Sequence, residues 1–169
     1  FSIHYALQIW GRLGVVLFVS HGVPPGWGLR LCDCEFVVQR GCAVFIGPTG
    51  TGKTHFLTVL GYAACERQLT VRFVRVVDML NELTTAQING TLRKSLRPYT
   101  RPALLLLDEL GYLPIDKRGA DLMFQVVAAR YERGSTVITT NRPFRDWGKT
   151  FDLDNTLATS FWLRAWPVL

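Results

Sequence analysis

A glycine-rich loop that ends in a lysine and a threonine is the feature of this sequence best suited to chemistry. Residues 47–54 fit the pattern G-x-x-x-x-G-K-[ST] at every fixed position. Glycines let the backbone curl so that successive N–H groups face one anion, and a helix beginning after the loop adds a favourable dipole. Lys53 is expected to reach the β- and γ-phosphates of a nucleotide, and the Thr54 hydroxyl to bind Mg²⁺. The predicted ATP-binding residues are Gly47, Pro48, Thr49, Gly50, Thr51, Gly52, Lys53, Thr54 and His55.

Two adjacent acids and an amide are suited to complete such a site. Asp108 and Glu109 directly follow the aliphatic run 103–107. Asp108 is predicted to anchor Mg²⁺ together with Thr54, and Glu109 to orient or deprotonate a water that attacks the γ-phosphate. Asn141 ends a β-branched run, where its amide can hold that water or contact the γ-phosphate. Simpler interpretations are that the acids cap a turn and that Asn141 forms one. The predicted catalytic residues are Lys53, Asp108, Glu109 and Asn141.

Alternating strands and helices are needed to position these residues, and the hydrophobic pattern predicts them. Strands are predicted at 42–46, 71–77, 103–107 and 135–140. Helices are predicted at 53–67, 78–97 and 120–133, with Gly90 interrupting the second. A continuous aliphatic strand suits a parallel sheet covered on both faces, so the predicted fold is α/β with helices on both faces. The glycine loop then lies between a strand and a helix, which distinguishes a phosphate loop from an incidental glycine turn.

Composition narrows the class of protein. The 169 residues are 49% hydrophobic and 19% charged, which is typical of one globular domain and not of a disordered chain. The net charge of +6 favours a polyanionic partner such as DNA or RNA, or a phosphate ligand, and equally fits a moderately basic enzyme.

The four cysteines form no C-x-x-C pair, which suits a reduced, cytoplasmic compartment and no separate metal site. Cys65 is predicted to lie in the core, on an apolar helix face.

The start of the chain gives no membrane signal. Its longest apolar run, 13–20, is far short of the ~20 residues that a membrane span needs, so no membrane partner is predicted. The run also lacks a convincing basic start and cleavage site, which argues against a signal peptide. Because the chain begins with Phe1, we interpret it as a fragment or a trimmed product.

Several segments together resemble the IstB-like ATP-binding proteins, which are helper ATPases of insertion-sequence transposition. These are AAA+ proteins related to the DnaC-type loaders of replicative helicases. The similar segments are 47–56, 60–62, 107–114, 119–122 with 124–125, 130–136, 140–144 and 147–148. The resemblance implies an AAA+ core over residues 31–159, with 47–54 as Walker A, Asp108 and Glu109 as Walker B, and Asn141 as sensor 1. It also implies ATP and Mg²⁺ as cofactors, several copies assembled on double-stranded DNA, and a partner transposase.

Both ends depart from the family pattern. Residues 1–30 do not resemble the family's N-terminal helices, and residues 160–169 stand where the family has a helix carrying Asp-Arg, a further strand and a tail. We interpret both ends as translation in a wrong reading frame or of a disrupted gene, so that the family's C-terminal part is lacking. Arg164 lies near the offset of the arginine finger, but Leu163 replaces the acid before it. Loss of such a finger can cost ~10³-fold in turnover, so nucleotide binding with weak or absent hydrolysis is predicted.

Two groups of basic residues are candidate contacts to DNA phosphates. They follow the second predicted helix and Asn141: Arg93, Lys94, Arg97, Arg101, Arg142, Arg145 and Lys149. Such groups give salt-dependent binding without sequence preference, and a solvated surface is the alternative interpretation. No motif that reads bases is visible, so non-specific binding is expected.

Four functions fit these motifs to different degrees. We favour an AAA+ ATPase that assists DNA transposition by ATP-dependent assembly on target DNA. A replicative helicase loader shares every motif, although 110–114 and 131–135 favour the transposition branch. A small-molecule kinase would use the same loop, but Glu109 and Asn141 are placed to position a water and not an acceptor hydroxyl. A remnant that binds nucleotide without turnover is the remaining alternative.

Overall fold

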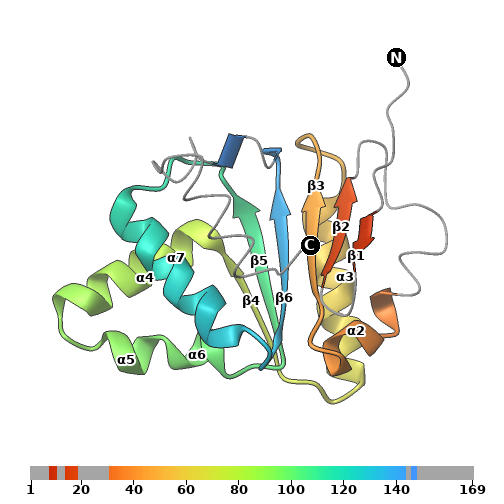
Figure 1. Ribbon diagram of the computed structural model, residues 1–169, viewed down its shortest axis with the longest axis horizontal. Helices are drawn as coiled ribbons and strands as arrows, with labels where there is room; N and C mark the ends of the chain where they lie inside the picture. Colours follow the sequence, from red (N-terminus) through yellow and green to blue (C-terminus); the bar gives the residue numbers. More distant parts are fainter. Residues whose placement is uncertain (1–7, 11–13, 19–30, 144–145, 148–169) are drawn as a thin grey trace.

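The computed structural model of the chain describes residues 8–10, 14–18, 31–143 and 146–147. Sequence-based predictions for Arg145, Lys149 and Arg164, for the segment 160–169 and for most of the segment 1–30 concern residues outside these ranges. The described residues form a six-stranded sheet with helices on either side (Figure 1).

The strands lie in the spatial order β1-β2-β3-β6-β5-β4. Their bounds are β1 Gln8–Trp10, β2 Gly14–Phe18, β3 Cys42–Ile46, β4 Val71–Arg75, β5 Leu104–Leu110 and β6 Ser135–Thr140. All neighbouring pairs are parallel except β1 with β2, which is antiparallel. The parallel strands therefore end at the same edge, at the top in Figure 1. Strands β3 to β6 were predicted from the sequence, whereas β1 and β2 were not.

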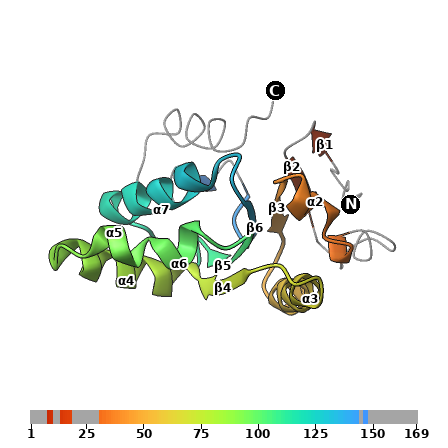
Figure 2. The same cartoon turned by 90° about the horizontal axis from the view of Figure 1, so that it is seen from below.

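The helices cover both faces of this sheet. Their bounds are α2 Glu35–Val38, α3 Lys53–Glu66, α4 Val76–Ile88, α5 Leu92–Ser95, α6 Arg97–Thr100 and α7 Lys117–Arg130. Figure 2 shows α2 and α3 on one face and α4 to α7 on the other. The predicted sheet with helices on both faces is confirmed, with β1 as the antiparallel exception. None of the helices in the described part of the chain is long and apolar enough to cross a membrane.

The aliphatic run in β5 divides between two hydrophobic cores. Leu104 and Leu106 pack in the core on the α2–α3 face, and Leu105 and Leu107 pack in the core on the α4–α7 face. Successive side chains of a strand point to opposite faces, so a strand covered on both sides is apolar at every position. Burial on both faces explains why residues 104–107 are all leucine.

Residues predicted to face the core are mostly found there. The predicted inward face of α7 is buried, namely Leu122, Met123, Val126 and Val127. The prediction for Cys65 was wrong, because this side chain is exposed. The buried stripe of α3 includes Leu60 and Ala64, and the next position along a helix lies about 100° further round the axis. Cys65 is therefore turned away from the sheet.

Several predicted element boundaries moved, and α7 also ends three residues earlier than predicted, at Arg130. Strand β4 ends at Arg75, so Val76 and Val77 belong to a helix and not to the strand. The predicted helix 78–97 is three helices, with Gly90 in a left-handed conformation (φ 70°) after the first of them. Helix α7 begins at Lys117, three residues earlier than predicted, because the Asp116 side chain accepts a hydrogen bond from the Gly119 N–H (2.8 Å) and caps the helix.

Candidate nucleotide site

The glycine loop leaves β3 at the carboxyl edge of the sheet and leads directly into α3. The Gly47 N–H donates to the Thr140 carbonyl (3.1 Å), which ties the start of the loop to the end of β6. Gly50 and Gly52 adopt φ of 83° and 81°, and a Cβ at either position would meet nothing within 4 Å. Glycine is therefore favoured here by the left-handed backbone and not by lack of space.

The Lys53 ammonium lies against its own loop. Its Nζ donates to the carbonyls of Gly47 (2.8 Å) and Pro48 (2.6 Å) and to Thr51 Oγ1 (3.3 Å). Burial lowers the pKa of Lys53, and the Asp108 and Glu109 carboxylates oppose that shift. The three donors of the ammonium thus meet neutral oxygens, which phosphate oxygens can replace with a stronger, charge-assisted interaction.

Asp108 lies beneath the loop and joins it to the sheet. Its side chain is 2% exposed. The Oδ1 atom accepts a hydrogen bond from Thr54 Oγ1 (3.1 Å), and it also accepts one from the Thr139 hydroxyl. The structure therefore brings together Thr54 and Asp108, the two residues that the sequence predicted to share a metal ion.

Glu109 lies on a distortion of β5. The register of β5 against β6 shifts between Leu107 and Leu110. Glu109 has a φ of 60°, which is unusual for a residue with a Cβ, and its N–H donates to Thr139 Oγ1 (2.9 Å). The sequence predicted that β5 would end before the acids, and this was wrong, because the strand continues through them to Leu110. The bulge leaves the Glu109 side chain exposed at the end of the strand.

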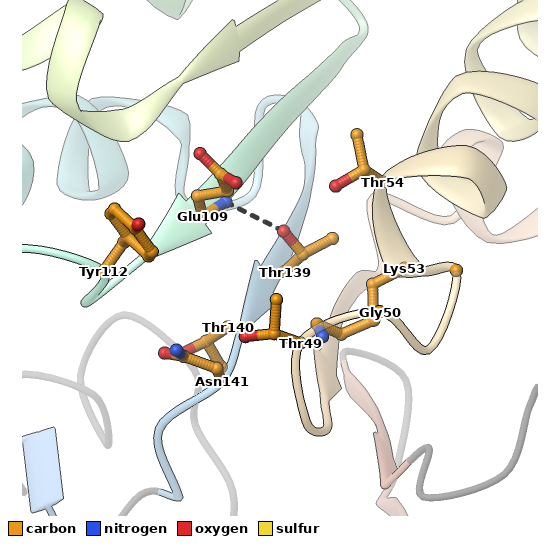
Figure 3. Close-up of a pocket in the computed structure, with 10 residues that line it drawn as sticks. Thr49, Gly50, Lys53, Thr54, Glu109, Tyr112, Thr139, Thr140 and Asn141 are labelled. Atoms are coloured by element: carbon orange, nitrogen blue, oxygen red, sulfur yellow. Dashed lines mark hydrogen bonds between the residues drawn. The ribbon is translucent and has the colours of Figure 1, made fainter.

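A pocket of about 320 Å³ opens at this edge of the sheet. Figure 3 shows Glu109 and Tyr112 on one wall, the loop residues on the opposite wall, and β6 residues between them. The lining residues are Thr49, Gly50, Gly52, Lys53, Thr54, Glu109, Tyr112, Thr139, Thr140 and Asn141. The pocket therefore unites the loop, the second acid and the amide that the sequence singled out.

Some predicted residues do not line this pocket, and some lining residues were not predicted. Gly47, Pro48, Thr51 and Asp108 are outside the lining, and His55 is exposed on the first turn of α3. Tyr112, Thr139 and Thr140 were not predicted as site residues. Buried threonines at the carboxyl end of a strand were the available signal for two of them, because a hydroxyl in a covered strand needs a partner.

Comparison with known proteins now decides the family. Residues 21–165 match the family described as IstB-like ATP binding protein. The chain belongs to this family. The loop and pocket described above thus lie in an IstB-like ATP-binding domain.

Two relatives are ATP-binding proteins of insertion sequences. That of IS232 from Bacillus thuringiensis subsp. berliner is 43% identical over 73% of this chain and 49% of its own length. That of IS5376 from Geobacillus stearothermophilus is 37% identical over 78% of this chain and 52% of its own length. The IstB-like chain therefore spans about half the length of these relatives.

The fold also has a counterpart among solved structures. The DnaC helicase loader superposes with a TM-score of 0.62, covering 82% of this chain and 76% of the loader at 18% identity. At this identity the likeness concerns the fold alone. The predicted fold class, a parallel α/β sheet with helices on both faces, is confirmed.

The candidate DNA-contacting residues that the structure describes are on the surface of the IstB-like domain. Arg93 and Lys94 lie on α5, Arg97 begins α6, and Arg101 follows it. All four are exposed, as is Arg142 beyond β6. Exposure is what a role in phosphate contact requires, and a solvated surface requires the same.

Proposed function

We propose that this IstB-like domain binds ATP with Mg²⁺ and carries the groups that promote its hydrolysis, as part of a helper ATPase of DNA transposition. The observation that carries the proposal is the contact of 3.1 Å between the Thr54 hydroxyl and the buried Asp108 carboxylate, beside the pocket. Mg²⁺ prefers oxygen ligands and is bound in proteins through one or two such groups plus substrate phosphates. A hydroxyl and a carboxylate in contact fit that requirement.

The loop, Lys53, Glu109 and Asn141 each have a role in this proposal. The loop N–H groups surround the phosphates, and Lys53 exchanges its loop carbonyls for β- and γ-phosphate oxygens. When bound, Mg²⁺ would offset the negative charge of these phosphates. Glu109, exposed at the pocket, orients a water and accepts its proton, and the Asn141 amide holds that water or contacts the γ-phosphate.

The wider role rests on the relatives and on surface charge. Both relatives are encoded by insertion sequences, which supports a part in transposition with a transposase as partner. The exposed arginines and lysine on α5 and α6 support non-specific contact with double-stranded DNA. Assembly of several copies and a cytoplasmic location complete the proposal.

The test is ATP binding and hydrolysis, measured with and without double-stranded DNA, in wild type, Lys53→Ala and Lys117→Ala. Loss of a charge-assisted interaction with phosphate is expected to weaken ATP binding by about 10-fold or more in Lys53→Ala, with loss of turnover. Lys117 is exposed at the start of α7 and does not line the pocket, so its variant serves as the matched control. Wild-type affinity in Lys53→Ala would refute the site. Turnover that DNA does not stimulate would refute the DNA-dependent part alone.

A further inference from the structure

One buried hydroxyl contacts both acids of the site. Thr139 lies in β6, and its side chain is 1% exposed. Its Oγ1 donates to Asp108 Oδ1. The same atom accepts a hydrogen bond from the Glu109 N–H at 2.9 Å, drawn as the dashed line in Figure 3. A hydroxyl carries one proton, so donation to the carboxylate leaves its lone pairs for the amide. Thr139 thus fixes the side chain of one acid and the backbone of the other.

The contact with Glu109 matters because the backbone there is strained. A residue with a Cβ is disfavoured in the left-handed region, and such residues persist only where their surroundings hold them. At Glu109 the register of β5 against β6 is shifted, and its N–H donates to a side chain. The Thr139 hydroxyl is therefore one of the groups that stabilise the bulge carrying the second acid.

The neighbouring threonine makes a different set of contacts. Thr140 Oγ1 donates to the Leu110 carbonyl (2.7 Å) and accepts from the Arg142 N–H (3.0 Å). These bonds tie the end of β6 to Leu110, the last residue of β5, and to the segment that follows β6. They do not involve either acid. The two hydroxyls at the end of β6 therefore have separate tasks.

We propose that Thr139 is a positioning residue for both acids. It orients the Asp108 carboxylate toward Thr54, and it holds the bulge from which the Glu109 carboxylate is presented to the pocket. The consequence for ATP turnover rests on the function proposed above. The consequence for the Glu109 backbone concerns the protein alone and is measurable without nucleotide.

Three variants separate this role from a general contribution to folding. Thr139→Val keeps the shape and removes the hydroxyl, and Thr139→Ser keeps the hydroxyl. Thr136→Val is the matched control, because Thr136 lies on the same strand, is 2% exposed and accepts a hydrogen bond from Arg130 Nε (3.0 Å) at the opposite end of β6. Both valine variants remove one buried hydroxyl, but only one of them affects the acids.

The first measurement is amide hydrogen exchange in the nucleotide-free protein, resolved at Glu109 by NMR. Thr139→Val is expected to exchange this amide about 10-fold faster than wild type, because one hydrogen bond is lost, whereas Thr139→Ser and Thr136→Val stay within about threefold. Equal exchange in the two valine variants would overturn the proposal. If Thr139→Val does not fold, Thr139→Ala makes the same test.

The second measurement separates turnover from nucleotide binding. Thr139→Val is expected to lower kcat by about 10-fold or more with KM for ATP within about threefold, and Thr139→Ser to restore kcat. Loss of kcat in Thr139→Ser as large as in Thr139→Val would overturn the proposal. A wild-type protein that does not bind ATP would refute the proposed function, while the exchange measurement would still decide the structural role of Thr139.

Discussion

At the scale of single residues, a substitution of Glu109 is expected to change ATP turnover strongly for a small change in the side chain. Its side chain is exposed at the pocket, whereas Asp108 beside it is buried and hydrogen-bonded. Glutamine keeps the size of the side chain but cannot accept the water's proton, so Glu109→Gln is expected to lower kcat by about 100-fold or more while ATP affinity stays near wild type. Single-turnover hydrolysis measures the effect on the chemical step, and a nucleotide titration measures the effect on ATP affinity. Turnover within threefold of wild type would exclude Glu109 as the general base.

The site residues that could be predicted are those whose role can be identified from a short stretch of sequence. Lys53 and Thr54 follow from the spacing of one loop, and Asp108 follows from its place after a leucine run. Thr139 could not be predicted in its role, because its partner Asp108 is 31 positions away and the contact depends on the register between β5 and β6. The left-handed conformation of Glu109 was hidden for the same reason, since a bulge is a property of the strand pair.

At the scale of elements, Arg130 joins the segments that begin the central strands. Its guanidinium donates to the carbonyls of Tyr99 (2.9 Å) in α6, Pro102 (2.9 Å) before β5, and Ser135 (2.6 Å) in β6. Burial lowers the pKa of Arg130 to about 10, so the group is still charged near neutral pH. A Cβ on Gly134 would lie 2.8 Å from its Nη2, which explains why a glycine follows α7 here.

Arg130→Met is therefore expected to destabilise the domain. The methionine fills part of the space but leaves several buried carbonyls without a donor, which costs about 3 kcal/mol or more in the free energy of unfolding. Urea denaturation measures the loss. Arg133→Met is the control, because Arg133 is exposed, and its variant is expected to stay within about 0.5 kcal/mol of wild type. An equal loss in both variants would contradict the assigned role of Arg130.

Element boundaries were predictable where the residue types change abruptly. Strands β3 and β6 match their predicted limits, since a glycine or polar residue stands at each end. The limit between β4 and α4 was missed because Val76 and Val77 continue an apolar, β-branched run into a helix. Whether such residues form a strand or a helix is decided by packing against the sheet, which local propensity does not report.

At the scale of the whole molecule, one end of the central strands is stabilised by a buried arginine and the other end carries the site residues. The amino ends of β5 and β6 are held by Arg130, and their carboxyl ends carry Asp108, Glu109 and Asn141. The alternation of strands and helices predicted the fold class, because each element is local in sequence. The strand order, and the placement of β1 and β2 beside β3, depends on long-range pairing that the sequence pattern does not report.

Because the pocket is built from both layers of the domain, Mg²⁺-ATP is expected to stabilise the whole described core. The loop leads into α3 on one face of the sheet, and Glu109 and Tyr112 belong to the segment that packs through Leu110 on the other face. A ligand at 100 times its Kd adds about 2.7 kcal/mol to stability. For a domain of this size, that raises Tm by about 5–10 °C.

Thermal unfolding with Mg²⁺-ATP, with ATP and a chelator, and with neither checks this expectation. The shift is expected to shrink without Mg²⁺, because the Thr54 and Asp108 oxygens then face the phosphates without a cation between them. It is expected to vanish in Lys53→Ala and to persist in Lys117→Ala. A shift of wild-type size in Lys53→Ala would mean that ATP stabilises the protein from another place, and the pocket at the carboxyl edge of the sheet would lose its assignment.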